Sequence, residues 1–193
     1  CNNLSIVYTA LGNYELAVEM AREGLNHSEF SELQHSLVDS LLKNKDYEGA
    51  QLALENYFSL YDEQTVSFYK HLQHRADWVS VNHKLGNSED IVQEAQDLLF
   101  EIYEHYQENP DISDYDFRDF EAAKNTVEEV LYHEHEGKPA LQRRDYYQGI
   151  SETYPDEANP QYNLMQVYNE LEDFEQVNRA ARLYLENQQS FLL

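Results

Sequence analysis

The stretch LGNYELA at residues 11–17 decides the fold, because related stretches return three more times along the chain. They are NKDYEGA at 44–50, LGNSEDI at 85–91 and LEDFEQV at 171–177. Each contains residues that end a helix, then an Asn, Asp or Ser that can cap the next helix, then an apolar residue three or four positions on. This order is typical of a tight turn between two helices. Four copies therefore predict a helical repeat protein.

The composition agrees with an all-α fold and offers little for strands. Only 6 Gly and 4 Pro interrupt the 193 residues, while Glu, Gln, Leu and Ala, which favour helix, are plentiful. A chain of this length can bury about 70% of the surface that it exposes when unfolded, so it needs no disulfide or metal to fold. The single cysteine, Cys1, cannot form an internal disulfide.

The spacing of the turns predicts five helix pairs. The helix around residues 65–85 should be longer than usual, and so should the helix at 115–135, which Gly137 and Pro139 would end. A shorter helix is expected at 140–153. The predicted pairs span residues 1–27, 30–61, 65–109, 115–154 and 158–189.

The repeated turns resemble those of the tetratricopeptide repeat (TPR) family, whose helix pairs recur about every 34 residues. Tyr14 and Tyr47 are 33 positions apart. The resemblance is good over 1–61 and 155–189, moderate over 72–109 and weak over 110–154. It implies an α-solenoid, a right-handed superhelix of about five antiparallel pairs forming one domain over 1–193. Small residues stand where the family brings two helices close together: Ala17, Ala21, Gly24, Ala50, Ala53, Ala180 and Ala181.

The formal net charge of −24 limits the possible partners. Nucleic acid would be repelled, since its binding relies on Lys and Arg that neutralise phosphates. An anionic membrane surface is disfavoured for the same reason, and no long apolar run predicts membrane insertion. The acidity is explained either by solubility or by a basic protein or peptide partner that the field attracts.

No motif predicts catalysis or a cofactor. The sequence has no phosphate-binding glycine loop, no Cys pair and no nucleophile elbow, so we expect a protein that is not an enzyme. His133 and His135 point about 200° apart on a helix, which favours a solvated helix end over a metal site. His71 and His74 could chelate a metal but are better interpreted as part of a polar helix face. Asp111, Asp114, Asp116 and Asp119 lack the EF-hand spacing and predict a charged loop.

The resemblance also implies a binding surface, because the first helices of successive TPR pairs line the concave face. The matching positions are polar and rich in amides, which suits hydrogen bonds to a bound peptide. Asn2, Ile6, Leu42, Gln73, Ala76 and Asn159 also match this face. The candidate binding residues are His35, Asp39, Lys43, Ser80, His83, Lys84, Tyr162, Gln166 and Asn169.

Chaperone-binding members of the family clamp a carboxyl-terminal peptide with Lys, Arg and Asn side chains. The matching residues here are Asn2, Ile6, Ser36, Gln73 and Asp77, and none is a cation. The carboxylate-clamp function is therefore not expected. Trp78, the only tryptophan, matches a core leucine of the family and is expected to pack in the interior.

These observations favour a non-catalytic protein-binding scaffold. One alternative is the peptide-sensing domain of a bacterial transcription regulator, and another is a periplasmic TPR module for envelope assembly or export. Either a cytoplasmic or a periplasmic location fits the single cysteine. The chain does not begin with Met, so we expect a fragment of a larger protein or a processed product, in which Cys1 could be a lipidated N-terminus.

Overall fold

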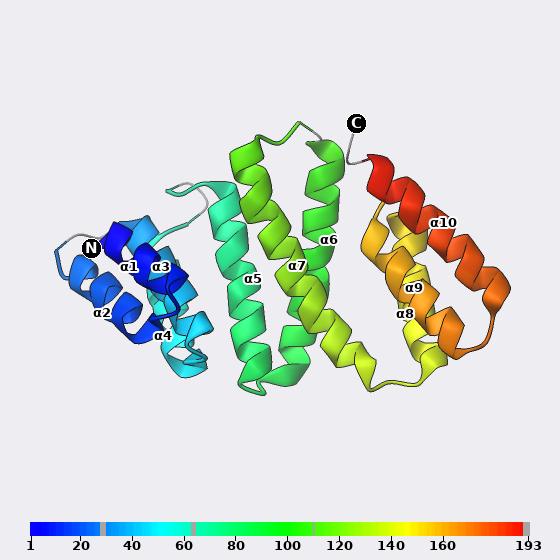
Figure 1. The fold of residues 1–193 in the computed structure, drawn as a ribbon, viewed down its shortest axis with the longest axis horizontal. Coiled ribbons are helices and arrows are strands. Elements are labelled where there is room, and N and C mark those ends of the chain that lie inside the picture. The colour runs from blue at the N-terminus through cyan, green and yellow to red at the C-terminus, as the bar shows by residue number, and fades with distance from the viewer. Residues whose placement is uncertain (28–29, 63–64, 110, 191–193) are drawn as a thin grey trace. The chain divides into compact units, whose positions relative to one another are not determined.

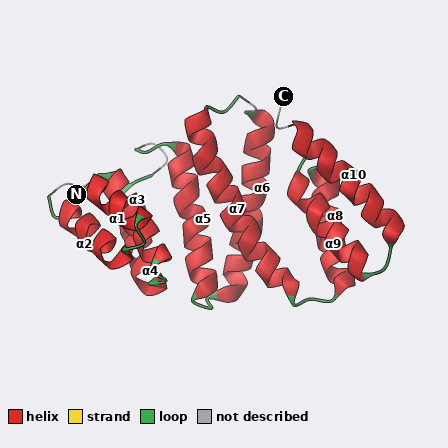
Figure 2. Ribbon diagram, in the orientation of Figure 1, coloured by secondary structure: helices red, strands yellow, loops and turns green. Residues whose placement is uncertain are grey.

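The computed structural model describes residues 1–27, 30–62, 65–109 and 111–190, apart from the side chains at positions 88, 89, 114, 115, 189 and 190. Within this part of the chain there are ten α-helices and no strand (Figure 2). The prediction of an all-α protein is confirmed. The long helices begin or end within three residues of their expected bounds, and the helix at 140–153 matches its expected bounds.

The helices follow one another with short connections (Figure 1). In chain order they are α1 (Asn2–Ala10), α2 (Tyr14–Leu25), α3 (Ser31–Lys43), α4 (Tyr47–Leu60), α5 (Phe68–Lys84), α6 (Ser88–Glu108), α7 (Asp114–Glu136), α8 (Ala140–Thr153), α9 (Ala158–Glu170) and α10 (Phe174–Ser190).

The chain divides into two compact units, Cys1–Leu131 and Tyr132–Leu193, which we call the N-terminal and C-terminal units. The boundary lies within α7. In the N-terminal unit α1 packs against α2 and α3, and contacts continue from α2 to α3, α4, α5 and α6. In the C-terminal unit α9 packs against both α8 and α10. The expectation of a single repeat domain stays a prediction.

The four repeated stretches form the same hinge. Gly12, Lys45, Gly86 and Glu172 each have a positive φ, between 58° and 79°. The N–H of each donates to the carbonyl three residues back, and the N–H of the next residue donates to the carbonyl five back. This pair of hydrogen bonds is the Schellman motif, which satisfies the last carbonyl groups of a helix. In three of the hinges the same next residue is the N-cap of the following helix, α2, α4 or α6.

The predicted capping residues act as caps in three of the four hinges. Asn13 Oδ1 accepts a hydrogen bond from the Leu16 N–H, and Asp46 Oδ1 accepts one from the Gly49 N–H at 2.9 Å. Asp173 Oδ1 accepts in the same way from Gln176. The Asn87 side chain instead donates to Asn82 Oδ1, although its backbone takes the N-cap position.

The hinge geometry predicts opposite effects for two substitutions. A Cβ at Gly86 would meet nothing within 4 Å, so Gly86→Ala should cost only the strain of its φ of +79°, about 1 kcal/mol. Lys45→Gly removes that strain at φ +59° and should stabilise the chain by about 0.5 kcal/mol. Urea denaturation followed by circular dichroism measures both. Destabilisation by Lys45→Gly would contradict the hinge assignment.

The core of the N-terminal unit lies between α2, α3, α4 and α5. Trp78 is half-buried, packs against this core and meets Phe58 edge to face with ring centroids 6.1 Å apart, which confirms its predicted packing role. Ala50 is fully buried in the same cluster. The buried members are Val18, Ala21, Leu37, Val38, Leu41, Ala50, Ala53, Leu54 and Val81.

The core of the C-terminal unit joins α8, α9 and α10. Its buried members are Tyr147, Leu164, Val167 and Ala180. Asn187 near the end of α10 donates from Nδ2 to the carbonyl oxygens of Pro155 and Glu157. These bonds hold the end of α10 against the turn between α8 and α9.

Candidate functional site

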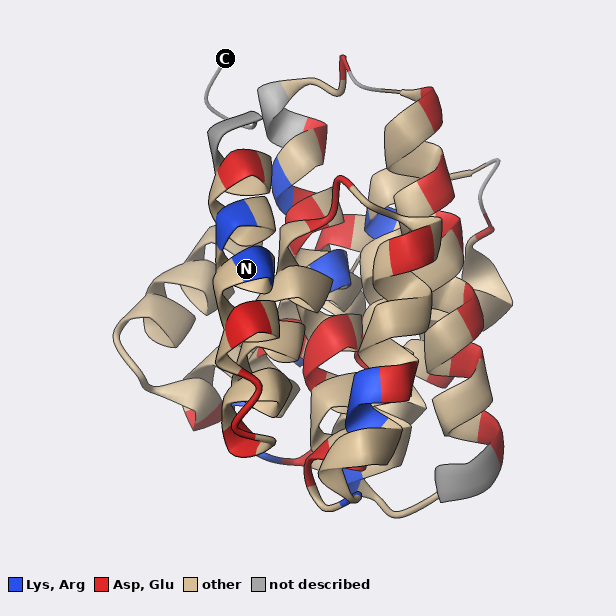
Figure 3. Cartoon of the chain, turned by 90° about the vertical axis from the view of Figure 1, so that its right-hand side faces the viewer, with Lys and Arg blue, Asp and Glu red and all other residues tan. Residues whose placement is uncertain are grey.

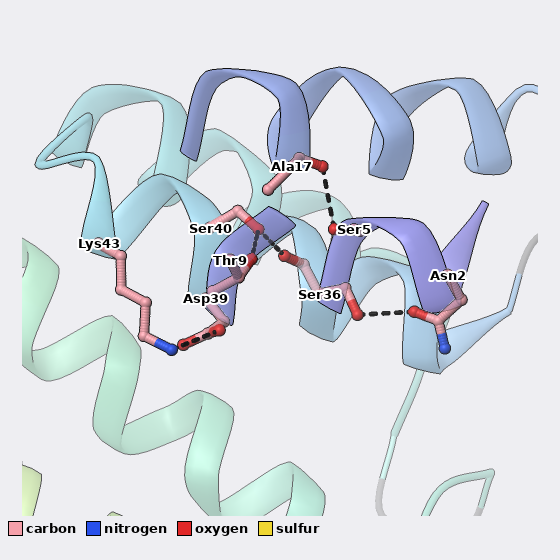
Figure 4. A network of polar contacts seen from close by, with 8 residues as sticks. All are labelled: Asn2, Ser5, Thr9, Ala17, Ser36, Asp39, Ser40 and Lys43. Carbon is pink, nitrogen blue, oxygen red and sulfur yellow. Dashed lines mark hydrogen bonds and ion pairs between the residues drawn. The ribbon is translucent and has the colours of Figure 1, made fainter. Parts of the chain in front are cut away.

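Three of the predicted binding residues share one face of α3. His35, Asp39 and Lys43 are spaced at four-residue intervals, which places them in a row along the helix. Lys43 Nζ donates to Asp39 Oδ2 at 2.9 Å, and the two side chains are 49% and 40% exposed (Figure 4). An ion pair this exposed contributes little to stability. Both side chains can therefore exchange this contact for one with a ligand at small cost.

His35, at the start of that row, lies beside a buried aromatic cluster. Its ring centroid is 5.1 Å from that of His74 on α5, and the His74 ring is 4.0 Å from that of Tyr57 on α4. His74 is fully buried, while His71 is half-buried. The interpretation of these two histidines as part of a polar helix face is therefore wrong for His74, because α4 and α3 cover it.

A buried amide and carboxylate complete this cluster on α5. Gln73 Nε2 donates to Asp77 Oδ1 at 2.9 Å, and Asp77 Oδ2 lies 3.6 Å from His74 Nδ1. Burial lowers the pKa of His35, with a smaller contribution from His74, and the carboxylates of Asp77, Asp39 and Asp119 oppose it. His35 is thus neutral at pH 7, with one nitrogen able to donate and the other to accept.

The other predicted residues of the N-terminal unit lie on α5. Ser80 and His83 are half-buried and Lys84 is exposed at the last position of the helix. Lys84 makes no ion pair within the described part of the chain. It therefore presents a cation that an acidic group of a ligand can reach.

Tyr162, Gln166 and Asn169 belong to the C-terminal unit, where all three are exposed along one face of α9. The Tyr162 ring lies 5.6 Å from the ring of Tyr184 on α10. Sequence reasoning missed a hollow between α8, α9 and α10, because its lining comes from the opposite face of α9 and from α8 and α10, where no binding residue was predicted. The polar side chains that line it are Gln148, Ser151, Glu152, Gln161, Tyr168, Gln176 and Arg179.

Four of the five positions that match the carboxylate clamp contact one another in two pairs, whereas Ile6 is exposed. Ser36 Oγ donates to Asn2 Oδ1 at 2.7 Å (Figure 4), and Gln73 bonds to Asp77 as described above. These four side chains are therefore hydrogen-bonded within the fold.

The two histidines at the end of α7 have different surroundings. His133 is exposed, with Nδ1 3.4 Å from Glu136 Oε2, whereas His135 is buried and stacks on Tyr146 of α8. The prediction that they face different ways is confirmed, but the prediction of a solvated helix end is wrong for His135. Over the described residues, no group of three or more His, Cys, Asp and Glu side chains is arranged to hold a metal ion.

Most of the acidic stretch predicted to be a loop belongs to α7. Asp111 is an exposed residue ahead of the helix, but α7 begins at Asp114. Ser113 Oγ donates to Asp116 Oδ2 at 2.7 Å and accepts from the Asp116 N–H, as a capping residue does. The charged-loop prediction is wrong for Asp114, Asp116 and Asp119, which lie in the first turns of α7, where the helix dipole favours negative charge.

Comparison with models of known protein families finds no match to the chain, and a search of the curated proteins finds none that matches significantly. No helix of the described residues has the length and apolar character needed to cross a membrane.

Proposed function

We propose that the chain is a non-catalytic scaffold that binds a protein or peptide on the first helices of successive TPR-like pairs, stacked as an α-solenoid. The observation that carries this proposal is the identical hinge after α1, α3, α5 and α9. When the hinges have the same backbone geometry, the helix pairs that they join are expected to have the same geometry too. Such pairs stack so that their first helices share a face. His35, Asp39 and Lys43 on α3, and Lys84 on α5, would lie on that face.

The chemistry of this face supports peptide binding. The neutral imidazole of His35 can donate to a peptide carbonyl or accept from a peptide N–H. Lys84 is suited to a carboxylate, and Lys43 could join it by leaving Asp39. The chain has 37 Asp and Glu residues against 13 Lys and Arg, and the acidic positions predominate along the ribbon (Figure 3). The negative field of the chain would attract a partner that carries basic residues around the carboxylate bound by Lys84. The same field would repel nucleic acid.

Removal of the two lysines should weaken binding of a peptide selected on this chain. Peptides from a random displayed library, enriched on the wild-type chain, serve as probes. The double change Lys43→Ala and Lys84→Ala should raise the dissociation constant at least tenfold, since it removes both cations of the face, and each charged contact is worth about 1 kcal/mol or more. Isothermal titration calorimetry at 0.05 and 0.15 M salt measures the loss.

The matched control removes two cations elsewhere in the same unit. Arg22 on α2 and Lys45 in the hinge are both exposed, so Arg22→Ala with Lys45→Ala makes the same change of net charge. This variant should bind the selected peptides within twofold of wild type. Equal losses in the two double variants would show that the lysines act only through net charge, and that the proposed face is not the site.

A further inference from the structure

The hollow of the C-terminal unit is lined by α8, α9 and α10, which follow one another in the chain (Figure 1). Its volume is about 180 Å³. That is the space of about six water molecules and less than the pockets of drug-sized ligands occupy, so it suits a small metabolite. The hollow lies on the side of α10 opposite to the exposed Phe174 and Leu185, so these three helices form it by themselves.

Each of the three helices turns one face towards the hollow. Residues four apart share a face of a helix, and each helix contributes such a pair to the lining. The pairs are Gln148 and Glu152 on α8, Leu164 and Tyr168 on α9, and Arg179 and Leu183 on α10. The fold thereby brings an anion, a cation, an amide and apolar side chains together in one small space.

Gln161 of α9 is the buried polar group of this lining. It is 3% exposed, and its Nε2 donates to Ser151 Oγ of α8. Its Oε1 has no hydrogen-bond partner among the described residues and is not sealed from solvent, so it is open to the hollow that Gln161 lines. A buried amide oxygen without a donor is costly, which favours a ligand that brings an N–H or O–H group to this position.

The lining also carries two opposite charges that are available to a ligand. Glu152 Oε1 accepts from Gln148 Nε2 at 2.8 Å, whereas Glu152 Oε2 has no partner in the described part of the chain. Arg179 is exposed and forms no ion pair with any described residue. The lining is therefore neutral in sum, although the whole chain carries −24.

We propose that this hollow binds a free α-amino acid in its zwitterionic form. The Arg179 guanidinium binds the carboxylate of the ligand through two N–H groups, the geometry in which arginine binds carboxylates best. Glu152 Oε2 and Gln161 Oε1 accept hydrogen bonds from its ammonium group. Leu164 and Leu183 contact the side chain of the amino acid.

The charges argue against other small ligands. A phosphate or a dicarboxylate would be repelled by Glu152 and by the net charge of −24. A simple amine would leave Arg179 without a partner and close to a like charge. A zwitterion has no net charge and pairs with both groups. The hollow also lies away from the α9 face of Tyr162, Gln166 and Asn169, so this inference does not depend on the proposed peptide-binding face.

The probes for the test are the common α-amino acids, each added separately to the whole chain. At about ten times its dissociation constant, a ligand that binds only the folded chain should raise Tm by about 3–5 °C. We expect at least one amino acid to do so, and isothermal titration calorimetry then measures its dissociation constant. Arg179→Gln should raise that constant at least about tenfold. The α-amide of the same amino acid should bind the wild-type chain equally weakly, and Arg179→Gln should not weaken its binding further.

Arg182→Gln is the matched control, because Arg182 is an exposed residue of α10 that does not line the hollow and the change of net charge is the same. This variant, and Lys43→Ala with Lys84→Ala, should bind the amino acid within about twofold of wild type. Circular dichroism verifies that each variant is folded. The proposal is overturned if no amino acid binds, or if Arg179→Gln and Arg182→Gln weaken binding equally. It is also overturned if the α-amide, or the corresponding acid without its amino group, binds the wild-type chain as tightly as the amino acid does.

Discussion

Acidification from pH 7 to pH 4.5 should destabilise the C-terminal unit by about 2–3 kcal/mol through His135 alone. His135 is 6% exposed, stacks on Tyr146 with ring centroids 3.8 Å apart, and has no hydrogen-bond partner for either ring nitrogen among the described residues. Burial, with a smaller contribution from Lys138, lowers the pKa of His135 to about 4, although Glu134 partly opposes this shift.

The direction of the effect follows from that pKa. An unfolded chain binds a proton at this histidine with a pKa near 6.5, whereas the folded chain resists protonation down to about pH 4. The contribution of neutral His135 to stability is therefore fully present above pH 6.5. It is lost as the pH falls from 6.5 towards 4, because the unfolded chain then takes up the proton first.

The variant His135→Phe isolates this effect from the titration of the carboxylates. Phenylalanine keeps the stacked ring and removes both unpaired nitrogens, so it should raise stability at pH 7 by about 1 kcal/mol. The gain should grow to about 3 kcal/mol at pH 4.5. Urea denaturation measures it, and hydrogen exchange of the α8 amides shows whether it lies in the C-terminal unit. A gain that is the same at both pH values would mean that His135 titrates normally.

Ala50→Leu should destabilise the N-terminal unit by about 1–3 kcal/mol. Ala50 is fully buried, and it lies in the core cluster with Leu54 and Val81. Three additional heavy atoms have no space there unless α4 moves away from the helices that it contacts. Because the substitution adds apolar volume and no polar group, the loss would report overpacking alone.

Ala122→Leu is the matched control for that substitution. Ala122 lies within α7 of the same unit and is exposed, so the same added volume meets water. Its free energy of unfolding should change by less than about 0.5 kcal/mol. If Ala50→Leu leaves the midpoint of chemical denaturation unchanged, then α4 does not make this close contact.

The hinges could be predicted from the sequence because their signals are local. A residue tolerant of positive φ, followed by a capping side chain, acts within a few positions and needs no distant partner. Even Lys45 and Glu172, which are not glycines, take the same conformation as Gly12 and Gly86. The end of α7 and the start of α8 were predictable for the same reason, since Gly137 and Pro139 lie between the two helices.

Burial of the histidines could not be predicted, because it depends on residues far away in the sequence. His74 is enclosed by Tyr57 and His35, which lie 17 and 39 positions before it, and the surroundings of His135 depend on Tyr146 of the next helix. Spacing along one helix shows which side chains share a face but not what covers that face. The nine candidate binding residues stay predictions for the same reason, since a ligand is what would identify them.

The pattern of helix contacts has a consequence for how fast the chain folds. Among the helix pairs in extensive contact in the described structure, the partners are one or two helices apart in the sequence. Little chain entropy is lost in closing such short loops, so the barrier to folding is low for a chain of this size. We expect each unit to form in milliseconds or less, with no slow search for distant pairings.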